Sequence, residues 1–181
     1  MGRAAGFTLL EVLIAMLVLA LGLVGGIAMG LHAMRTRHES ALLSAAVQIA
    51  AGMADRMRAN AAQVPASYLG VDFDAHADPV PVPPVNLCRS EACDPARLAR
   101  LDVYDLQRQV RAALPGGRAR VCRDAQPYAN GRLRWECTGG ALDPVVIKIG
   151  WRGRRPDGTP ERDGQGGHGP GVALAVPGVG A

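Results

Sequence analysis

The residue whose chemistry most needs an explanation is Glu11, a carboxylate at the start of a long apolar run. From Val12 to Leu31 no residue carries a charge, and Leu, Val, Ile, Ala and Gly predominate. A helix of about 20 predominantly apolar residues is long enough to cross the hydrocarbon core of a membrane. An ionisable side chain inside such a helix costs at least ~2.5 kcal/mol and therefore indicates a function.

Three simpler interpretations of this run exist. A secretory signal peptide has an apolar region of about 7–15 residues, whereas this run is longer and has Glu11 near its start. A plain membrane anchor tolerates Glu11 near the interface, where the side chain reaches water. A buried helix of a soluble protein is not normally apolar on all faces. The pattern alone favours an anchor, with a signal peptide second.

The residues around Glu11 favour a more specific interpretation. The stretch GFTLLE, Gly6 to Glu11, resembles the processing site of type IV prepilins and of the pseudopilins of type II secretion. In those families a dedicated prepilin peptidase cuts after the glycine and methylates the new amino terminus. The resemblance implies cleavage between Gly6 and Phe7 and N-methylation of Phe7. Glu11 is then the fifth residue of the processed chain, where these families hold a glutamate.

Processing would give Glu11 an assembly role. A carboxylate and an ammonium that are buried separately each cost several kcal/mol, and pairing them offsets much of this cost. Glu11 can pair with the Phe7 amine of a neighbouring subunit, which would set the axial register of docking. The simpler alternative is that Glu11 lies among lipid headgroups and pairs with nothing.

Glycines form a second pattern in the apolar run. Gly22, Gly26 and Gly30 recur every four residues and so share one helical face. Small residues at this spacing let membrane helices approach closely, and each lowers helix propensity by up to ~1 kcal/mol relative to Ala. One interpretation is that the stripe is a packing surface or a site where the helix melts locally during assembly. The other is that the glycines have no role and simply occur in a lipid-facing helix.

Beyond Leu31 the same helix becomes amphipathic and is expected to run from Phe7 to about Asn60. Its apolar residues recur at three- and four-residue steps: Leu43, Ala46, Val47, Ala50, Met53, Ala54 and Met57. The run ADRMRAN, Ala54 to Asn60, is similar to the end of the long helix in the type IV pilus modification protein PilV family of minor pilins. That resemblance extends to a cysteine pair in the next loop, a helix ending in LPGG, and short strands.

The middle of the chain reads as a loop and a helix. Residues 61–94 are predicted to be extended, because the prolines between Asp78 and Pro84 lack backbone donors and disfavour helix before them. A helix is predicted from Asp94, a good N-cap, or from Asp102, and it is expected to end near Ala113.

The last third reads as a small sheet followed by a tail. Strands are predicted at Arg120–Arg123, Arg132–Cys137 and Val145–Trp151. The alternation of apolar and polar side chains supports the second strand, and Asn130-Gly131 is a strong hairpin signal before it. Residues 152–181 are rich in Gly and Pro and are interpreted as a mobile tail.

The cysteines number four: Cys88, Cys93, Cys122 and Cys137. An exported domain places them in the oxidising periplasm, where an even count favours disulfides. Three connectivities are possible, and we expect Cys88–Cys93 and Cys122–Cys137. A zinc site is the alternative, although the spacings do not match the usual two-residue knuckles. The histidines are scattered and no catalytic arrangement stands out, so neither an enzyme nor a cofactor is expected.

Composition argues against a nucleic-acid partner. Aromatic residues make up only 4% of the chain and the net charge is +4, spread along the sequence. Few rings are therefore available for stacking on bases, and a mild charge excess usually means a solvated surface.

Together these features predict an α+β, type IV pilin-like fold with a long N-terminal helix on a small antiparallel sheet. The expected segments are a leader (1–6), an apolar transmembrane and pilus-core helix (7–31), its amphipathic half (32–60), a globular head (61–151) and a flexible tail (152–181).

The resemblance implies a minor pilin that primes assembly of type IV pili in a tip-initiating complex and supports adhesion or twitching motility. Its implied partners are the prepilin peptidase, the inner membrane, other minor and major pilins, and a tip adhesin. It would span the inner membrane once, with its C-terminal domain in the periplasm, and then move into the surface pilus. The alternatives are a type II secretion pseudopilin and a simple membrane-anchored periplasmic binding domain.

Overall fold

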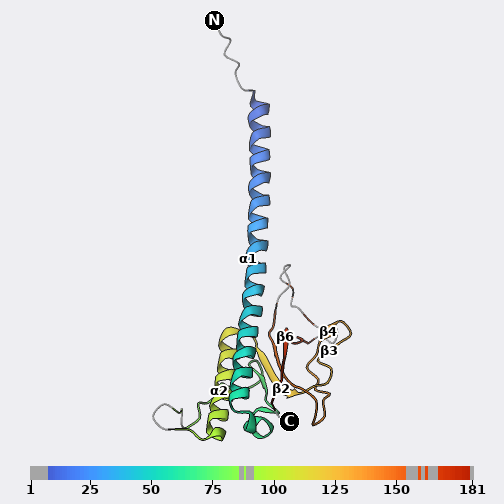
Figure 1. The fold of residues 1–181 in the computed structure, drawn as a ribbon. Coiled ribbons are helices and arrows are strands. Elements are labelled where there is room, and N and C mark those ends of the chain that lie inside the picture. Colours follow the sequence, from blue (N-terminus) through green and yellow to red (C-terminus); the bar gives the residue numbers. More distant parts are fainter. Residues whose placement is uncertain are drawn as a thin grey trace. The chain divides into compact units, whose positions relative to one another are not determined.

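The computed structural model describes residues 8–85, 88, 92–153, 159, 162 and 167–179. They form a long helix, α1 (Leu9–Ala59), a second helix, α2 (Pro95–Ala113), a four-stranded antiparallel sheet and a two-stranded hairpin (Figure 1). The predicted α+β class is confirmed. The chain divides into two units, the first ending at Glu39 and the second beginning at Ser40, and each is described by itself.

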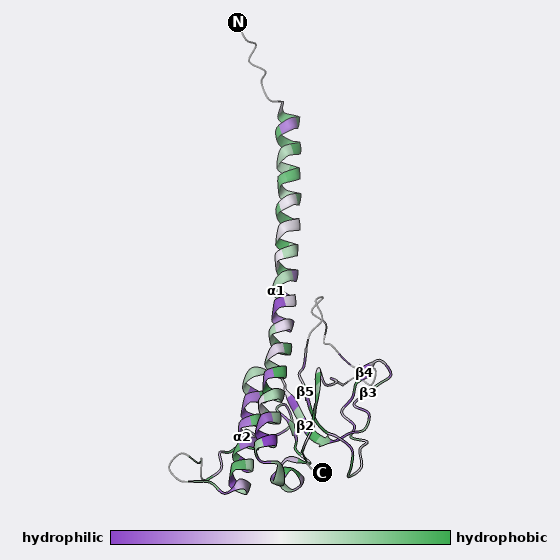
Figure 2. Ribbon diagram, viewed as in Figure 1, coloured by the Kyte–Doolittle hydropathy of each residue, from purple (hydrophilic) through white to green (hydrophobic). Residues whose placement is uncertain are grey.

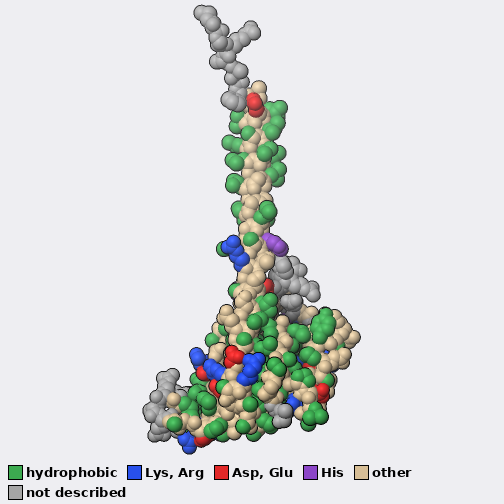
Figure 3. Space-filling model, viewed as in Figure 1, with side chains coloured by type: hydrophobic (Ala, Val, Ile, Leu, Met, Phe, Trp, Pro, Cys, Tyr) green, Lys and Arg blue, Asp and Glu red, His purple; other side chains and the backbone are tan. Residues whose placement is uncertain are grey.

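The first unit consists of the apolar part of α1. Its composition of Leu, Ala, Val and Met suits a helix, and no proline precedes Pro65. From Leu9 to Met34 its large hydrophobic side chains are exposed on every side of the helix. Figure 2 shows the hydrophobic residues along this part of the helix, and Figure 3 shows apolar side chains on the face in view.

The remainder of α1, from Ser40 onward, has one buried face. Seven residues at three- and four-residue steps form it: Leu42, Ala46, Ile49, Ala50, Met53, Ala54 and Met57. The predicted face is wrong at Leu43 and Val47, which are 45% and 48% exposed. Leu42 and Ile49 continue the row of Ala46 and Met53, whereas Leu43 and Val47 each lie one residue, about 100°, further round the helix.

The segment after α1 is more structured than predicted. Ala61–Gln63 forms a 3-10 turn, Val64–Tyr68 a single π-helical turn, and Asp72–Asp74 the strand β1. The prediction of an extended loop is wrong here, because β1 gains its strand conformation from pairing with a distant strand and from burying Phe73. The proline-rich stretch from Asp78 to Pro84 has neither helix nor strand, as expected.

Helix α2 begins where the sequence signals it most clearly. The side chain of Asp94 accepts a hydrogen bond from the Arg97 N–H at 2.8 Å, and Pro95 is the first helical residue. The predicted start at Asp94 is therefore confirmed over Asp102. Pro115 and two glycines follow Leu114 and end the helix.

The sheet has the order β1-β2-β5-β6, with neighbouring strands antiparallel. Strand β2 is Arg118–Arg123, β5 is Val145–Gly150 and β6 is Val172–Val176. All six residues of β5, the second of the two central strands, are buried. A central strand buried on both faces carries a nearly continuous apolar run, and this explains the sequence VVIKIG.

A small hairpin pairs β3 (Tyr128–Ala129) with β4 (Arg132–Leu133). Its turn residues Asn130 and Gly131 have φ values of 53° and 77°, as a two-residue turn with left-handed backbone requires. The predicted strand at Arg132–Cys137 is wrong beyond Leu133. The carbonyls of Arg134 and Glu136 instead accept hydrogen bonds from a buried side chain described below.

The tail prediction is also wrong for the residues that the structure describes near the C-terminus. Residues 172–176 pair with β5 along its length, and Val176 and Val179 are buried. The aliphatic run VALAV was obscured by the glycines and prolines on both sides of it. The folded unit therefore extends beyond the predicted boundary of 151, and the rest of the predicted tail (154–158, 160–161, 163–166 and 180–181) lies outside the described residues.

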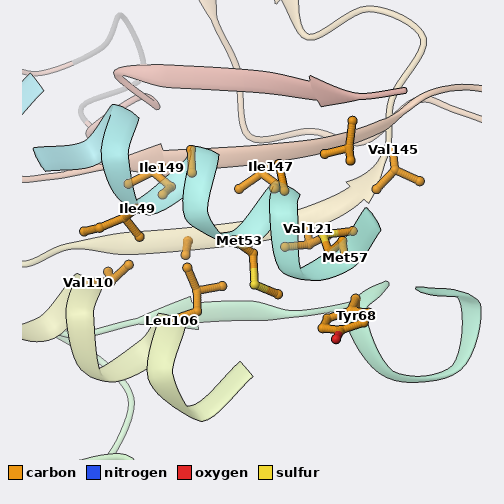
Figure 4. Close-up of a cluster of buried hydrophobic side chains, with 14 of the residues drawn as sticks. Ile49, Met53, Met57, Tyr68, Leu106, Val110, Val121, Val145, Ile147 and Ile149 are labelled. Carbon is orange, nitrogen blue, oxygen red and sulfur yellow. The ribbon is translucent and has the colours of Figure 1, made fainter. Parts of the chain in front are cut away.

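One hydrophobic core holds the second unit together (Figure 4). Side chains of α1 pack between those of α2 and the sheet, and Tyr68 closes one end (Figure 4). The labelled members are Ile49, Met53, Met57, Tyr68, Leu106, Val110, Val121, Val145, Ile147 and Ile149. The amphipathic half of α1 is therefore a part of the head's own core.

Candidate assembly site

The start of α1 carries the first part of the site. Thr8 caps the helix: its hydroxyl oxygen accepts a hydrogen bond from the Glu11 N–H at 3.3 Å, and its carbonyl accepts from the same N–H at 3.0 Å. Thr8 and Glu11 thus have the spacing of a capping box. Gly6 and Phe7 lie outside the described residues.

Glu11 is exposed, and its carboxylate makes no ion pair with any residue that the structure describes. A negative side chain in the first turn also interacts favourably with the positive end of the helix dipole. The negative charge of Glu11 therefore lies at the N-terminal end of the helix.

The surface behind Glu11 is apolar. Helix α1 contains an 18-residue stretch that is long and apolar enough to cross a membrane, and none of this stretch is buried within the chain. At Gly22, Gly26 and Gly30 an added Cβ would meet no other atom within 4 Å. Nothing among the described residues covers this surface, which is therefore available for contact with lipid or with other protein chains.

In the second unit, a polar network links the end of α1 to α2. Arg56 forms ion pairs with Asp102 at 3.3 Å and Asp105 at 3.2 Å, while the Tyr68 hydroxyl donates to Asp102 at 2.7 Å. Asn60 donates to the Tyr68 hydroxyl oxygen at 3.2 Å. Burial, together with the hydrogen bond to Asp102, raises the pKa of Tyr68 far above its ordinary value, so it remains a neutral donor.

A second network is fully buried. Lys148 on β5 donates to Asp124 Oδ2 at 2.5 Å and to the carbonyls of Arg134 and Glu136 at 2.8 and 2.5 Å. Both ionic side chains have 0% exposure. The second oxygen of Asp124 accepts from the N–H of Gln126 and from the Thr138 hydroxyl.

These partners determine the charge state of Asp124. Burial alone would raise the pKa of this carboxyl, but the hydrogen bonds from Lys148, Gln126 and Thr138 outweigh burial and lower the pKa to about 2. The carboxylate is therefore ionised at neutral pH and holds the segment from Gln126 to Thr138 against β5.

The cysteines lie in two disulfides. Cys88 is bonded to Cys93, and Cys122 on β2 is bonded to Cys137, with Cα separations of 5.5 and 6.2 Å. The second bond and the Lys148–Asp124 pair hold the same segment, which has little regular secondary structure. Among the described residues, no group of three His, Cys, Asp or Glu side chains could hold a metal ion.

Sequence reasoning missed the two ionic networks. Lys148 offered a signal, because it is the only lysine of the chain and interrupts an aliphatic strand. The sequence around Asp124 gave no such signal, because its partner Lys148 lies 24 residues further along the chain. The structure places Glu11 and the glycine stripe in the first unit and both disulfides in the second, so the predicted residues form no single cluster.

Comparison with known proteins agrees with this geometry. Residues 28–104 match the family model of the Tt1218-like proteins, described as type IV pilin Tt1218. Residues 1–27 match the prokaryotic N-terminal methylation motif. No curated protein and no solved structure matches the chain. The two family matches adjoin and together span residues 1–104, which include the long helix and the first part of α2. Over this part the chain is similar to type IV pilins with an N-terminal methylation motif, which are components of a pilus or pseudopilus.

Proposed function

We propose that this pilin is a PilV-like minor pilin that primes the assembly of type IV pili. The observation that carries the proposal is an exposed apolar helix that continues into a small disulfide-bonded head. At its start lies Glu11, which has no ion-pair partner among the described residues. The similarity of Ala54–Asn60 to the PilV family supports the finer assignment. In this role it would act in the tip-initiating complex with other minor and major pilins and support display of an adhesin or twitching motility.

Processing is the first step of the proposed role. The prepilin peptidase would cut between Gly6 and Phe7 and methylate the amine of Phe7. The match of residues 1–27 to the methylation motif supports this. The capped start of α1 at Thr8 also supports it, because the helix begins directly behind the new terminus.

The proposed segments follow from this order of events. Residues 1–6 would be the leader and 7–31 the membrane and pilus-core helix, with Gly22, Gly26 and Gly30 as a packing stripe. The C-terminal domain would lie in the periplasm before entering the pilus, and we propose that Cys88–Cys93 and Cys122–Cys137 form there. Peptide mapping without reduction tests those pairs, and four free thiols in periplasmic material would contradict them.

Assembly itself would depend on Glu11. In a fibre core, its carboxylate would pair with the Phe7 ammonium of a neighbouring subunit. Removal of one partner from a buried ion pair costs about 3–5 kcal/mol. The pairing would also fix the axial register between subunits, because each helix carries one such carboxylate near its start.

The test is the substitution Glu11→Gln, which keeps size and polarity but removes the charge. We expect cleavage and membrane insertion to persist, since a membrane charge is costly, whereas incorporation into sheared pili should fall by about 100-fold or more. Glu39→Gln, in the same helix, is the matched control and should leave incorporation unchanged. Equal incorporation of wild type and Glu11→Gln would refute the pairing.

A pseudopilin of type II secretion is the second candidate, because such proteins share the methylation motif and the apolar helix. Deletion of the gene distinguishes the two. Loss of surface pili with normal enzyme secretion supports the minor pilin, whereas loss of secreted enzymes with normal pili supports the pseudopilin. Mass spectrometry of the mature amino terminus tests both against a simple anchored domain, which would retain residues 1–6.

A further inference from the structure

The second unit contains a pocket that none of the preceding roles uses. It has a volume of about 430 Å³, which lies within the range of small-molecule sites. We call it the Trp151 pocket. It lies between the turn of the β3–β4 hairpin and the residues around the start of β6. The lining residues with functional side chains or large apolar groups are Asn130, Arg132, Leu133, Trp151, Arg162 and His168.

The pocket is cationic. Arg132 and Arg162 line it, and no Asp or Glu is among its described lining residues. Neither arginine makes an ion pair or a side-chain hydrogen bond with any residue in the described part of the chain. Several other arginines of the head are paired; Arg118, for example, binds Asp72 through two nitrogens at 3.0 Å each. Toward the described residues, the guanidinium groups of the pocket therefore keep donors that could bind an anion.

The pocket also presents an aromatic surface held in a fixed position. The Trp151 ring lies against Gly171, where an added Cβ would come within 2.7 Å of two ring carbons. A Cβ added at Gly150 would likewise come within 2.8 Å of a Trp135 ring carbon, and the Trp135 Nε1 donates to the His168 carbonyl at 2.6 Å. The glycines therefore let both indoles lie on the backbone, and the Trp135 bond fixes the peptide that carries the His168 side chain.

We propose that the Trp151 pocket binds an acidic saccharide, through a sugar ring that carries a carboxylate. The half-buried indole offers a flat apolar surface for the ring, and planar guanidinium groups match a carboxylate with two parallel hydrogen bonds. Asn130 and His168 also line the pocket, and amide and imidazole groups can form hydrogen bonds with hydroxyl groups. This goes beyond the proposed assembly function and does not depend on it.

Single-stranded nucleic acid fits the pocket less well. Proteins that bind it combine a basic groove along the backbone with several aromatic rings for successive bases. Here one tryptophan and two arginines gather in a single pocket, and the other tryptophan already donates its N–H to the His168 carbonyl. The arrangement suits one charged ring rather than a strand.

The test measures binding by the processed full chain in detergent micelles. Tetragalacturonate is the probe, maltotetraose the neutral comparison and a thymidine tetranucleotide the nucleic-acid comparison, each titrated by calorimetry. We expect saturable binding of tetragalacturonate that weakens with added salt. Arg132→Ala should weaken it about tenfold, Arg132→Lys less, and Trp151→Phe measurably, while Arg100→Ala on α2 is the matched control and should have no effect.

Each variant is first checked for an unchanged midpoint of thermal unfolding, so that weaker binding reports on the pocket. No saturable binding of tetragalacturonate, equal binding of maltotetraose, or tighter binding of the tetranucleotide would overturn the proposal. Unchanged affinity in Arg132→Ala would overturn it as well. Pilus assembly is measured separately, so a failure here leaves the assembly proposal standing.

Discussion

The two parts of α1 bury their apolar side chains in different ways. Between Leu9 and Met34 the large hydrophobic side chains are exposed, whereas from Leu42 to Met57 one face is buried and the other is polar or exposed. The first part is apolar all round and the second has an apolar stripe. The second part of the helix therefore buries its apolar side chains in the core of the head, whereas the described residues leave the apolar surface of the first part uncovered.

This division predicts that substitutions in the head and substitutions in the apolar part of α1 affect different properties of the protein. Substitutions in the head should lower its free energy of unfolding without changing processing or membrane insertion. Glu11→Gln should lower incorporation into pili and leave the free energy of unfolding of the head unchanged, because the proposed partner of Glu11 belongs to a neighbouring subunit. The following predictions test this separation, from the largest expected effect to the smallest.

Asp124→Asn should destabilise the head most, by about 4 kcal/mol, because it leaves the buried ammonium of Lys148 without a counter-charge. Chemical denaturation of the full processed chain in detergent measures the loss. Asp55→Asn is the matched control, since Asp55 has a 76% exposed side chain in a surface pair and should change stability by less than about 0.5 kcal/mol. A small effect of Asp124→Asn, or impaired membrane insertion, would contradict the separation.

Met57→Ala should cost about 3 kcal/mol, because Met57 is fully buried between the sheet and α2 and its truncation leaves a cavity. Val47→Ala, ten residues earlier on the exposed face, should cost little. The comparison is made by denaturant unfolding of both variants. Equal losses would mean that the exposed face of this half is also packed in the native protein.

Acid should weaken the head by about 2.5 kcal/mol through Asp124 alone. Its pKa falls from 3.8 to about 2 on folding, and each pKa unit corresponds to about 1.4 kcal/mol. A carboxyl whose pKa is lower in the folded protein stabilises the fold at any pH above its pKa in the unfolded chain. This contribution is lost as the pH falls from about 4–5 to 2. Unfolding measured across this range should show the loss, and a Lys148→Met, Asp124→Leu double variant should lack this contribution.

Local signals in the sequence predicted the elements that local interactions stabilise. The cap at Asp94, the start of α2 and the Asn130-Gly131 turn were all predicted, because each depends on residues within one turn of the chain. The long helix was also predicted, within two residues at its start. The α+β class followed from these elements together.

The errors concern residues whose conformation depends on distant partners. Strand β1 forms by pairing with β2, and β6 by pairing with β5 across a glycine-rich stretch. In the second half of the predicted strand at Arg132–Cys137, backbone carbonyls instead accept hydrogen bonds from Lys148. No local pattern encodes such partners, so neither the extent of the head nor its two ionic networks could be predicted.

The buried Lys148 has a practical consequence. It is the only lysine in the sequence, and all other basic residues besides histidine are arginines. Because its amine is fully buried and donates to three acceptors, amine-directed labels and cross-linkers will find no lysine on the surface of the folded head. Acylation at residue 148 would require the segment holding Asp124, Arg134 and Glu136 to open, and its rate would report the frequency of that opening.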